Sequence, residues 1–176
     1  MSFDIREIVL GPGEGKKLNA VEHPFTFKAI GSDTDGHYSI FESTLHGGGP
    51  GQHIHDNEEE AFYVIEGNLR VLLGEITIEA LAGSFILVPR GTVHTFSRAD
   101  KNPVKLLVII SPAGFENFFF EAIGEDEVDA VMMAERALDI GHKYGVTFTG
   151  PPIGLSLIHI SAPTSPRLNS YAVFCL

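Results

Sequence analysis

Cysteine, basic residues and long apolar runs are scarce in this chain of 176 residues. Its single cysteine, Cys175, excludes an internal disulfide, so the fold must be stabilised by its core. Only 12 Lys and Arg stand against 23 Asp and Glu, a formal charge of −11. This acidity argues against nucleic acid and against an anionic membrane, because both bind clustered basic residues. No apolar run approaches the roughly 20 residues of a transmembrane helix.

Several recognisable motifs are also missing from the sequence. The first residues, MSFDIREIVL, lack a basic leader followed by an apolar stretch, which predicts that no signal peptide is present. A soluble, cytoplasmic protein is therefore expected. There is no GxSxG elbow, no phosphate-binding loop ending in Lys-Ser/Thr and no CxxC pair. The Gly-rich stretch Gly47–Gly51 is followed by no helix start, which argues against phosphate binding there.

Short alternating apolar runs, separated by glycine and proline turns, dominate the sequence as far as residue 110. The 19 Gly and 10 Pro residues lie mostly between these runs. Such regular spacing is typical of an antiparallel sandwich or barrel. The strands are expected at Phe25–Ile30, His37–Leu45, Glu60–Ile65, Leu69–Leu73, Ile76–Ala80, Phe85–Val88, Val93–Ser97 and Lys105–Ile110.

The character of the sequence changes after this ladder of strands. Phe115, Phe118 and Phe119 are spaced for one face of a short helix, and Asp126–Tyr144 reads as a longer helix that ends before Gly145. We expect one domain over residues 1–154. Residues 155–176 do not continue the pattern, and LSLIHI resembles a translated transposon-end adaptor from DNA library preparation. A non-native tail is the first interpretation, and a genuine C-terminal strand is the alternative.

Four residues form a pattern that suggests metal chemistry. His53 and His55 are two apart, so on an extended chain both imidazoles point to one face. Glu60 opens the next predicted strand and can face this pair, and His94 lies on a later strand. Three imidazoles and a carboxylate suit divalent iron, manganese, cobalt, nickel, copper or zinc. Taken singly, His53 or His55 would more simply be a surface or hydrogen-bonded histidine; the joint spacing favours a site.

The joint spacing is similar to that of the cupin superfamily. The pattern Gly47-x5-His53-x-His55-x4-Glu60-x6-Gly67 in this chain resembles the first cupin motif. The pattern Gly83-x5-Pro89-x-Gly91-x2-His94 resembles the second. The likeness is greatest to small single-domain cupins grouped with quercetin 2,3-dioxygenase-like proteins. It implies an all-β jelly-roll barrel with C-terminal helices packed outside. It also implies one transition-metal ion held inside the barrel by His53, His55, Glu60 and His94.

Neighbouring residues are interpreted from this assignment. The second motif usually ends in Asn, where Arg98 stands here, so the loop after His94 is expected to differ. Glu58 and Glu59 are expected to be solvated turn residues. Phe62 and Phe96 each lie two residues from a ligand and should point inward, either as pocket walls or as plain core. A set of other histidines is expected at the surface: His23, His37, His46 and His142.

The resemblance implies a metal-dependent, dioxygenase-like oxidoreductase. Its substrate would be a small organic molecule, aromatic or flavonol-like, and Glu60 would also act as a base on a substrate hydroxyl. Two alternatives stay open: a non-catalytic module that binds a small ligand or metal, and a metal-dependent isomerase or decarboxylase. Exposed strand edges on small barrels often pair between subunits, which predicts a homodimer.

Overall fold

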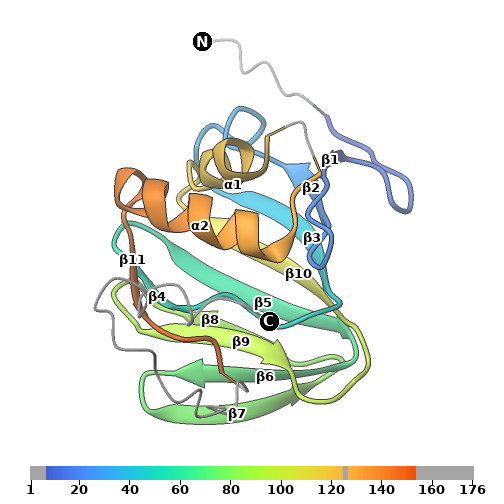
Figure 1. The fold of residues 1–176 in the computed structure, drawn as a ribbon. Coiled ribbons are helices and arrows are strands. Elements are labelled where there is room, and N and C mark those ends of the chain that lie inside the picture. The colour runs from blue at the N-terminus through green and yellow to red at the C-terminus, as the bar shows by residue number, and fades with distance from the viewer. Residues whose placement is uncertain (1–6, 125–126, 154–176) are drawn as a thin grey trace.

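Two antiparallel sheets facing one another make up most of the molecule, as the computed structural model in Figure 1 shows. The structure describes residues 7–124 and 127–153. One sheet has six strands in the order β1-β2-β3-β10-β5-β8, and the other has five in the order β11-β4-β9-β6-β7. Strands β1, β2 and β3 are consecutive neighbours, as are β6 and β7, but β3 pairs with β10 and β4 with β9, so the chain also crosses between the sheets. The predicted all-β jelly-roll fold is confirmed.

The strands follow the apolar runs of the sequence closely. The first sheet contains β1 (Lys16–Leu18), β2 (Phe25–Ala29), β3 (Ser39–Leu45), β10 (Val104–Ser111), β5 (Glu59–Glu66) and β8 (Phe85–Val88). The second contains β11 (Val146–Gly150), β4 (Gln52–His55), β9 (His94–Arg98), β6 (Asn68–Leu73) and β7 (Ile76–Leu81). Strand β1 was not predicted from the sequence, since three residues with only Leu18 buried are too short to show an alternation.

The core lies between the sheets, and β3 and β10 show the alternation that builds it most clearly. Along β3 and β10 every second residue is buried, and the two strands pair in register, with Phe41 opposite Val108. Phe62, Leu69 and Leu106 are fully buried from both sheets. Alternation therefore sends one face of each strand inward, and the same rule places the histidines of β4 inside.

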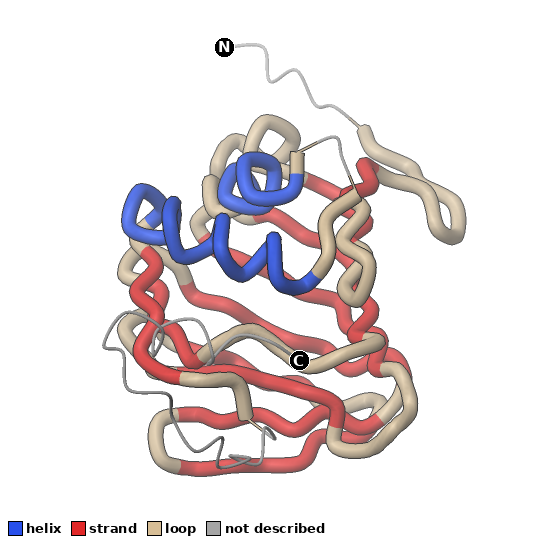
Figure 2. The backbone as a smooth tube through the Cα atoms, viewed as in Figure 1, coloured by secondary structure: helices blue, strands red, loops and turns tan. Residues whose placement is uncertain are grey.

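Two helices gather at one side of the strands, as the tube in Figure 2 makes clear. Helix α1 spans Glu116–Ile123, as the phenylalanine spacing predicted. The predicted Asp126–Tyr144 helix is shorter than expected: α2 spans Ala130–Ile140, and a 3-10 turn, η1, covers Gly141–Tyr144. Val128 bridges Ala20 in an extended conformation, and the Asp129 side chain accepts a hydrogen bond from the Met132 N–H, so the helix begins only afterwards.

None of the helices in the described part of the chain is long and apolar enough to cross a membrane. The predicted non-native tail, 155–176, lies outside the described residues, so its origin and the domain boundary at 154 stay predictions.

Candidate metal centre and the adjoining cavity

Strand β4 directs two imidazoles into the molecule. His53 and His55 are buried while Ile54 between them is half-exposed, which is the alternation expected of a strand. β4 lies between β11 and β9, and its register sets His53 directly opposite His94. Three imidazoles from two adjacent strands therefore share one interior face of the five-stranded sheet.

The carboxylate comes from the opposite sheet. Glu60, near the start of β5, is buried, and its Oε2 lies 2.9 Å from His94 Nε2 and 3.7 Å from His55 Nε2. One ligand atom from each of His53, His55, Glu60 and His94 can be chosen so that all four lie within 4.8 Å of one another. The four residues that the motif spacing predicted as metal ligands thus converge on one point between the two sheets.

Backbone hydrogen bonds orient two of the rings. His53 Nδ1 lies 2.8 Å from the Gly51 carbonyl oxygen, and His94 Nδ1 lies 2.9 Å from that of Thr92. Because a carbonyl oxygen only accepts, each Nδ1 carries a proton. The Nε2 of His53 therefore presents its lone pair, whereas the Nε2 of His94 donates to Glu60 Oε2 and must lose that proton before it can bind a metal ion. Metal-bound histidines are held in the same way. The donor set and its orientation therefore fit a first-row divalent metal ion.

Burial and mutual charge shape the protonation of this cluster. Burial lowers the pKa of His53 from 6.5 to about 3, with a further lowering from the charges of His94 and His55. Burial alone would lower the pKa of His94, but its hydrogen bond to Glu60 and the carboxylate charge outweigh burial and raise it. Burial would raise the pKa of Glu60, yet the same hydrogen bond and the surrounding imidazoles lower it. A neutral His53 and an ionised Glu60 are the forms that bind a cation.

Glu58 departs from the sequence-based prediction. It was expected in a solvated turn, and Glu59 is indeed exposed, but Glu58 is only 7 % exposed. Its Oε2 lies 3.7 Å from His55 Nδ1. The signal for this burial was present in the sequence, since Glu58 is two residues before Glu60 and shares its face.

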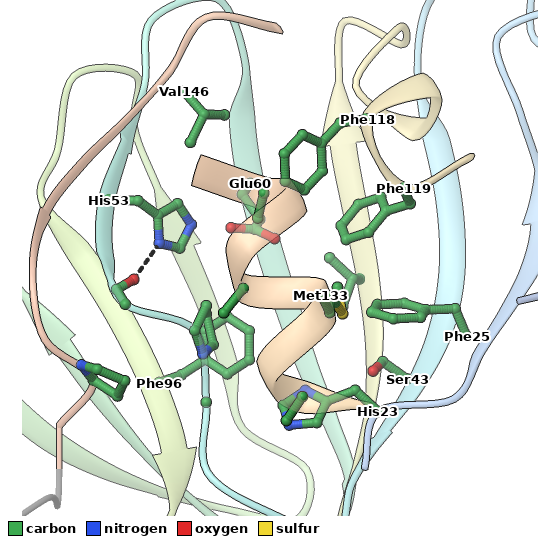
Figure 3. A pocket seen from close by; sticks show the side chains of 18 of the residues that line it. His23, Phe25, Ser43, His53, Glu60, Phe96, Phe118, Phe119, Met133 and Val146 are labelled. Carbon is green, nitrogen blue, oxygen red and sulfur yellow. Dashed lines mark hydrogen bonds between the residues drawn. The ribbon is translucent and has the colours of Figure 1, made fainter. Parts of the chain in front are cut away.

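A cavity of about 160 Å³ opens beside the cluster. One water molecule needs roughly 15 Å³ of such cavity volume, so the space is sufficient for a small organic molecule. Both sheets and both helices line it, with Met133 of α2 and Phe118 and Phe119 of α1 among the walls shown in Figure 3. Helix α2 therefore covers one side of the space between the two sheets.

The polar groups of the cavity stand at its two ends. His53 and Glu60 lie at one end in Figure 3, and His23 and Ser43 lie at the other. His23 was expected at the surface but is half-buried, and burial lowers its pKa, against a hydrogen bond to the backbone of Gly48 and the charge of Glu22. Sequence gave no signal for this residue, because it lies in a turn whose burial depends on the distant Gly48 loop.

The two predicted phenylalanines occupy different places. Phe96 lines the cavity, and its ring centroid lies 4.8 Å from that of Phe62, which is fully buried in the core. Arg98, which replaces the usual Asn of the second motif, donates from Nε to the Gly47 carbonyl oxygen and from Nη1 to that of Lys101. This side chain ties the Gly-rich loop to β9.

Close packing explains the composition of the Gly-rich loop. A Cβ on Gly49 would stand 1.4 Å from the Phe96 carbonyl oxygen, so no side chain fits there.

Fold and site together define the class of protein: a double-sheet jelly roll with a buried cluster of three histidines and one glutamate that suits a metal ion.

Comparisons with known proteins agree with this class. Residues 41–110 match the Cupin domain family. Over 116 residues, 63 % of this chain, the sequence is 31 % identical to quercetin 2,3-dioxygenase of Bacillus subtilis (strain 168). The matched region spans only 33 % of that protein's length. Residues 41–110 therefore match a cupin domain, and His53, His55, Glu60 and His94 all lie within this segment.

Solved structures share the fold at low sequence identity. An RmlC-like cupin from Shewanella frigidimarina NCIMB 400 is similar with a TM-score of 0.55 and 16 % identity, covering 64 % of this chain and 96 % of that one. The polyketide cyclase RemF from Streptomyces resistomycificus is similar with a TM-score of 0.52 and 21 % identity, covering 60 % of this chain and 80 % of that one. At these identities the likeness concerns the fold alone.

Proposed function

We propose that this protein is a metal-dependent dioxygenase that acts on a small, largely apolar organic molecule of the aromatic or flavonol type. One observation carries the proposal: the His and Glu cluster opens directly on a cavity whose walls are otherwise mostly apolar. His53, His55, Glu60 and His94 would hold the metal. When bound, such an ion supplies coordination sites for dioxygen and a substrate oxygen.

The residues of the chain supply the rest of the reaction. Glu60 lines the cavity, and against the effect of burial the surrounding imidazoles lower its pKa in the metal-free protein, so an ionised Glu60 is placed to accept the proton of a substrate hydroxyl. Phe96, Phe118 and Met133 surround the substrate with apolar surface and limit the entry of water.

The far end of the cavity supports a substrate with a second polar group. Ser43 is only 6 % exposed and lines the cavity. It faces the same end as His23 (Figure 3). A molecule with an oxygen at each end and an apolar middle, such as a hydroxylated flavonol, would satisfy both ends at once.

Turnover with and without oxygen tests the proposal. The metal-loaded protein is incubated with a panel of flavonols and related enols, aerobically with isotopically labelled dioxygen and anaerobically. Oxygen consumption with label in the product is expected. Turnover that persists without oxygen would instead indicate an isomerase or decarboxylase, and full metal occupancy without any turnover would indicate a binding module.

A further inference from the structure

Two buried polar atoms face each other beside the candidate metal centre without a hydrogen-bond partner. They are His55 Nδ1 and Glu58 Oε2, which lie 3.7 Å apart. Both side chains are almost fully buried, at 3 % and 7 % exposure. A buried donor or acceptor without a partner is costly, so two such atoms in apposition need an explanation.

The other two histidines of the cluster show what His55 lacks. His53 and His94 each donate their Nδ1 proton to a backbone carbonyl oxygen two residues earlier in the sequence. No carbonyl plays this part for His55, whose Nδ1 is unpartnered in the described structure. Glu58 is the acidic group that stands at that position.

The placement of Glu58 is not a consequence of the turn that carries it. Its neighbours Asp56, Asn57 and Glu59 are exposed, and Glu58 alone is buried. The turn is fixed by the Asp56 N–H, which donates to the Gly145 carbonyl oxygen at 2.9 Å. With the turn fixed, alternation into β5 sends Glu58 inward on the face that Glu60 occupies.

We propose that Glu58 is a positioning residue for His55. Its carboxylate accepts the Nδ1–H of His55, which leaves Nε2 as the free nitrogen aimed at the metal. A small rotation of either side chain closes the 3.7 Å separation to hydrogen-bonding distance. A carboxylate in this role fixes the ring and makes the opposite nitrogen a stronger donor. The inference rests on the metal centre proposed above.

Cobalt(II) binding provides the test, because its visible absorption reports ligand geometry and requires no substrate. Metal-free wild type, Glu58→Ala, Glu58→Gln and the exposed neighbour Glu59→Ala are titrated with Co²⁺ alone. Glu58→Ala is expected to weaken binding by about 10- to 100-fold and to change the spectrum. Glu58→Gln keeps an acceptor oxygen and should recover part of the affinity. Glu59→Ala should behave as wild type.

A double-mutant cycle separates positioning from general stability. In a His55→Ala background, Glu58→Ala should have little further effect on Co²⁺ affinity, since the ring it orients is absent. Circular dichroism of each metal-free variant checks folding, and Glu58→Gln carries the test if Glu58→Ala does not fold. Unchanged affinity and spectrum in the folded variants would overturn the role of Glu58 alone, whereas a wild type that binds no Co²⁺ would overturn the metal centre as well.

Discussion

Acid should unfold the metal-free protein over a pH range set largely by His53. This imidazole is 7 % exposed, and its pKa falls from 6.5 to about 3, mainly because of burial. Below about pH 6.5 the His53 imidazole is therefore protonated in the unfolded chain but stays neutral in the folded chain. The stability contributed by this group is present above pH 6.5 and is lost as the pH falls toward 3.

His94 and Glu60 affect the free energy of unfolding over different pH ranges. The raised pKa of His94 gives stability below its unfolded value of 6.5, which is lost only as the pH rises through the folded value. The lowered pKa of Glu60 matters as the pH falls below its ordinary 4.5. The pH interval from 6.5 to 4.5 therefore separates the effect of His53 from those of His94 and Glu60, and the lowered pKa of His23 acts in the same direction as that of His53. At about 1.4 kcal/mol per pH unit, His53 should remove about 3 kcal/mol over this interval.

Urea unfolding at a series of pH values measures this effect. Wild type, His53→Gln and the exposed-histidine control His46→Gln are freed of metal with a chelator and unfolded between pH 7 and 4.5. Wild type and His46→Gln should lose about 3 kcal/mol more free energy of unfolding than His53→Gln over the interval. Equal pH dependence in wild type and His53→Gln would refute the reasoning.

Two further predictions concern packing and assembly. Gly49→Ala should lower the free energy of unfolding by about 3 kcal/mol, because its Cβ would overlap the Phe96 carbonyl oxygen. Gly11→Ala should cost far less, because its Cβ would meet only the end of the Glu14 side chain, and similar denaturation midpoints for the two variants would contradict this. Phe85 and Leu87 are 61 % and 51 % exposed on β8, an edge strand, so we predict a homodimer through this edge. Phe85→Asp should convert the dimer to a monomer, and light scattering that finds wild type monomeric at micromolar concentration would count against the prediction.

Most of the fold could be predicted from the sequence, because local periodicity carries the information for each strand. The eight strand runs before residue 111 coincide with strands of the structure within about two residues. The helix boundary was less accessible. The acidic residues before Ala130 are compatible with a first helical turn, but the tertiary bridge from Val128 to Ala20 and the capping by Asp129 start the helix later.

The residues of the candidate site also fall into those that the sequence predicts and those that it does not. His53, His55, Glu60 and His94 could be found because strand alternation and motif spacing act over short distances. Glu58 could have been found by extending that alternation two residues backward from Glu60. His23 could not, because its position at the far end of the cavity depends on a contact with the Gly48 loop, which lies 25 residues further along the chain. The Gly47–Gly51 loop is a second example of a contact that sequence does not predict. Its composition predicts a loop, but the close approach of Gly49 to β9 depends on the tertiary structure.

Metal content tests the central claim most directly. Wild type, His53→Ala and His94→Ala are purified without chelators, checked for folding by circular dichroism and subjected to elemental analysis. We expect about one transition-metal ion per wild-type chain and less than roughly a tenth of that in either folded variant, since each loses a ligand of the cluster. Stoichiometric metal in both folded variants, or none in wild type that has been offered every first-row divalent ion, would contradict a metal centre formed by His53, His55, Glu60 and His94.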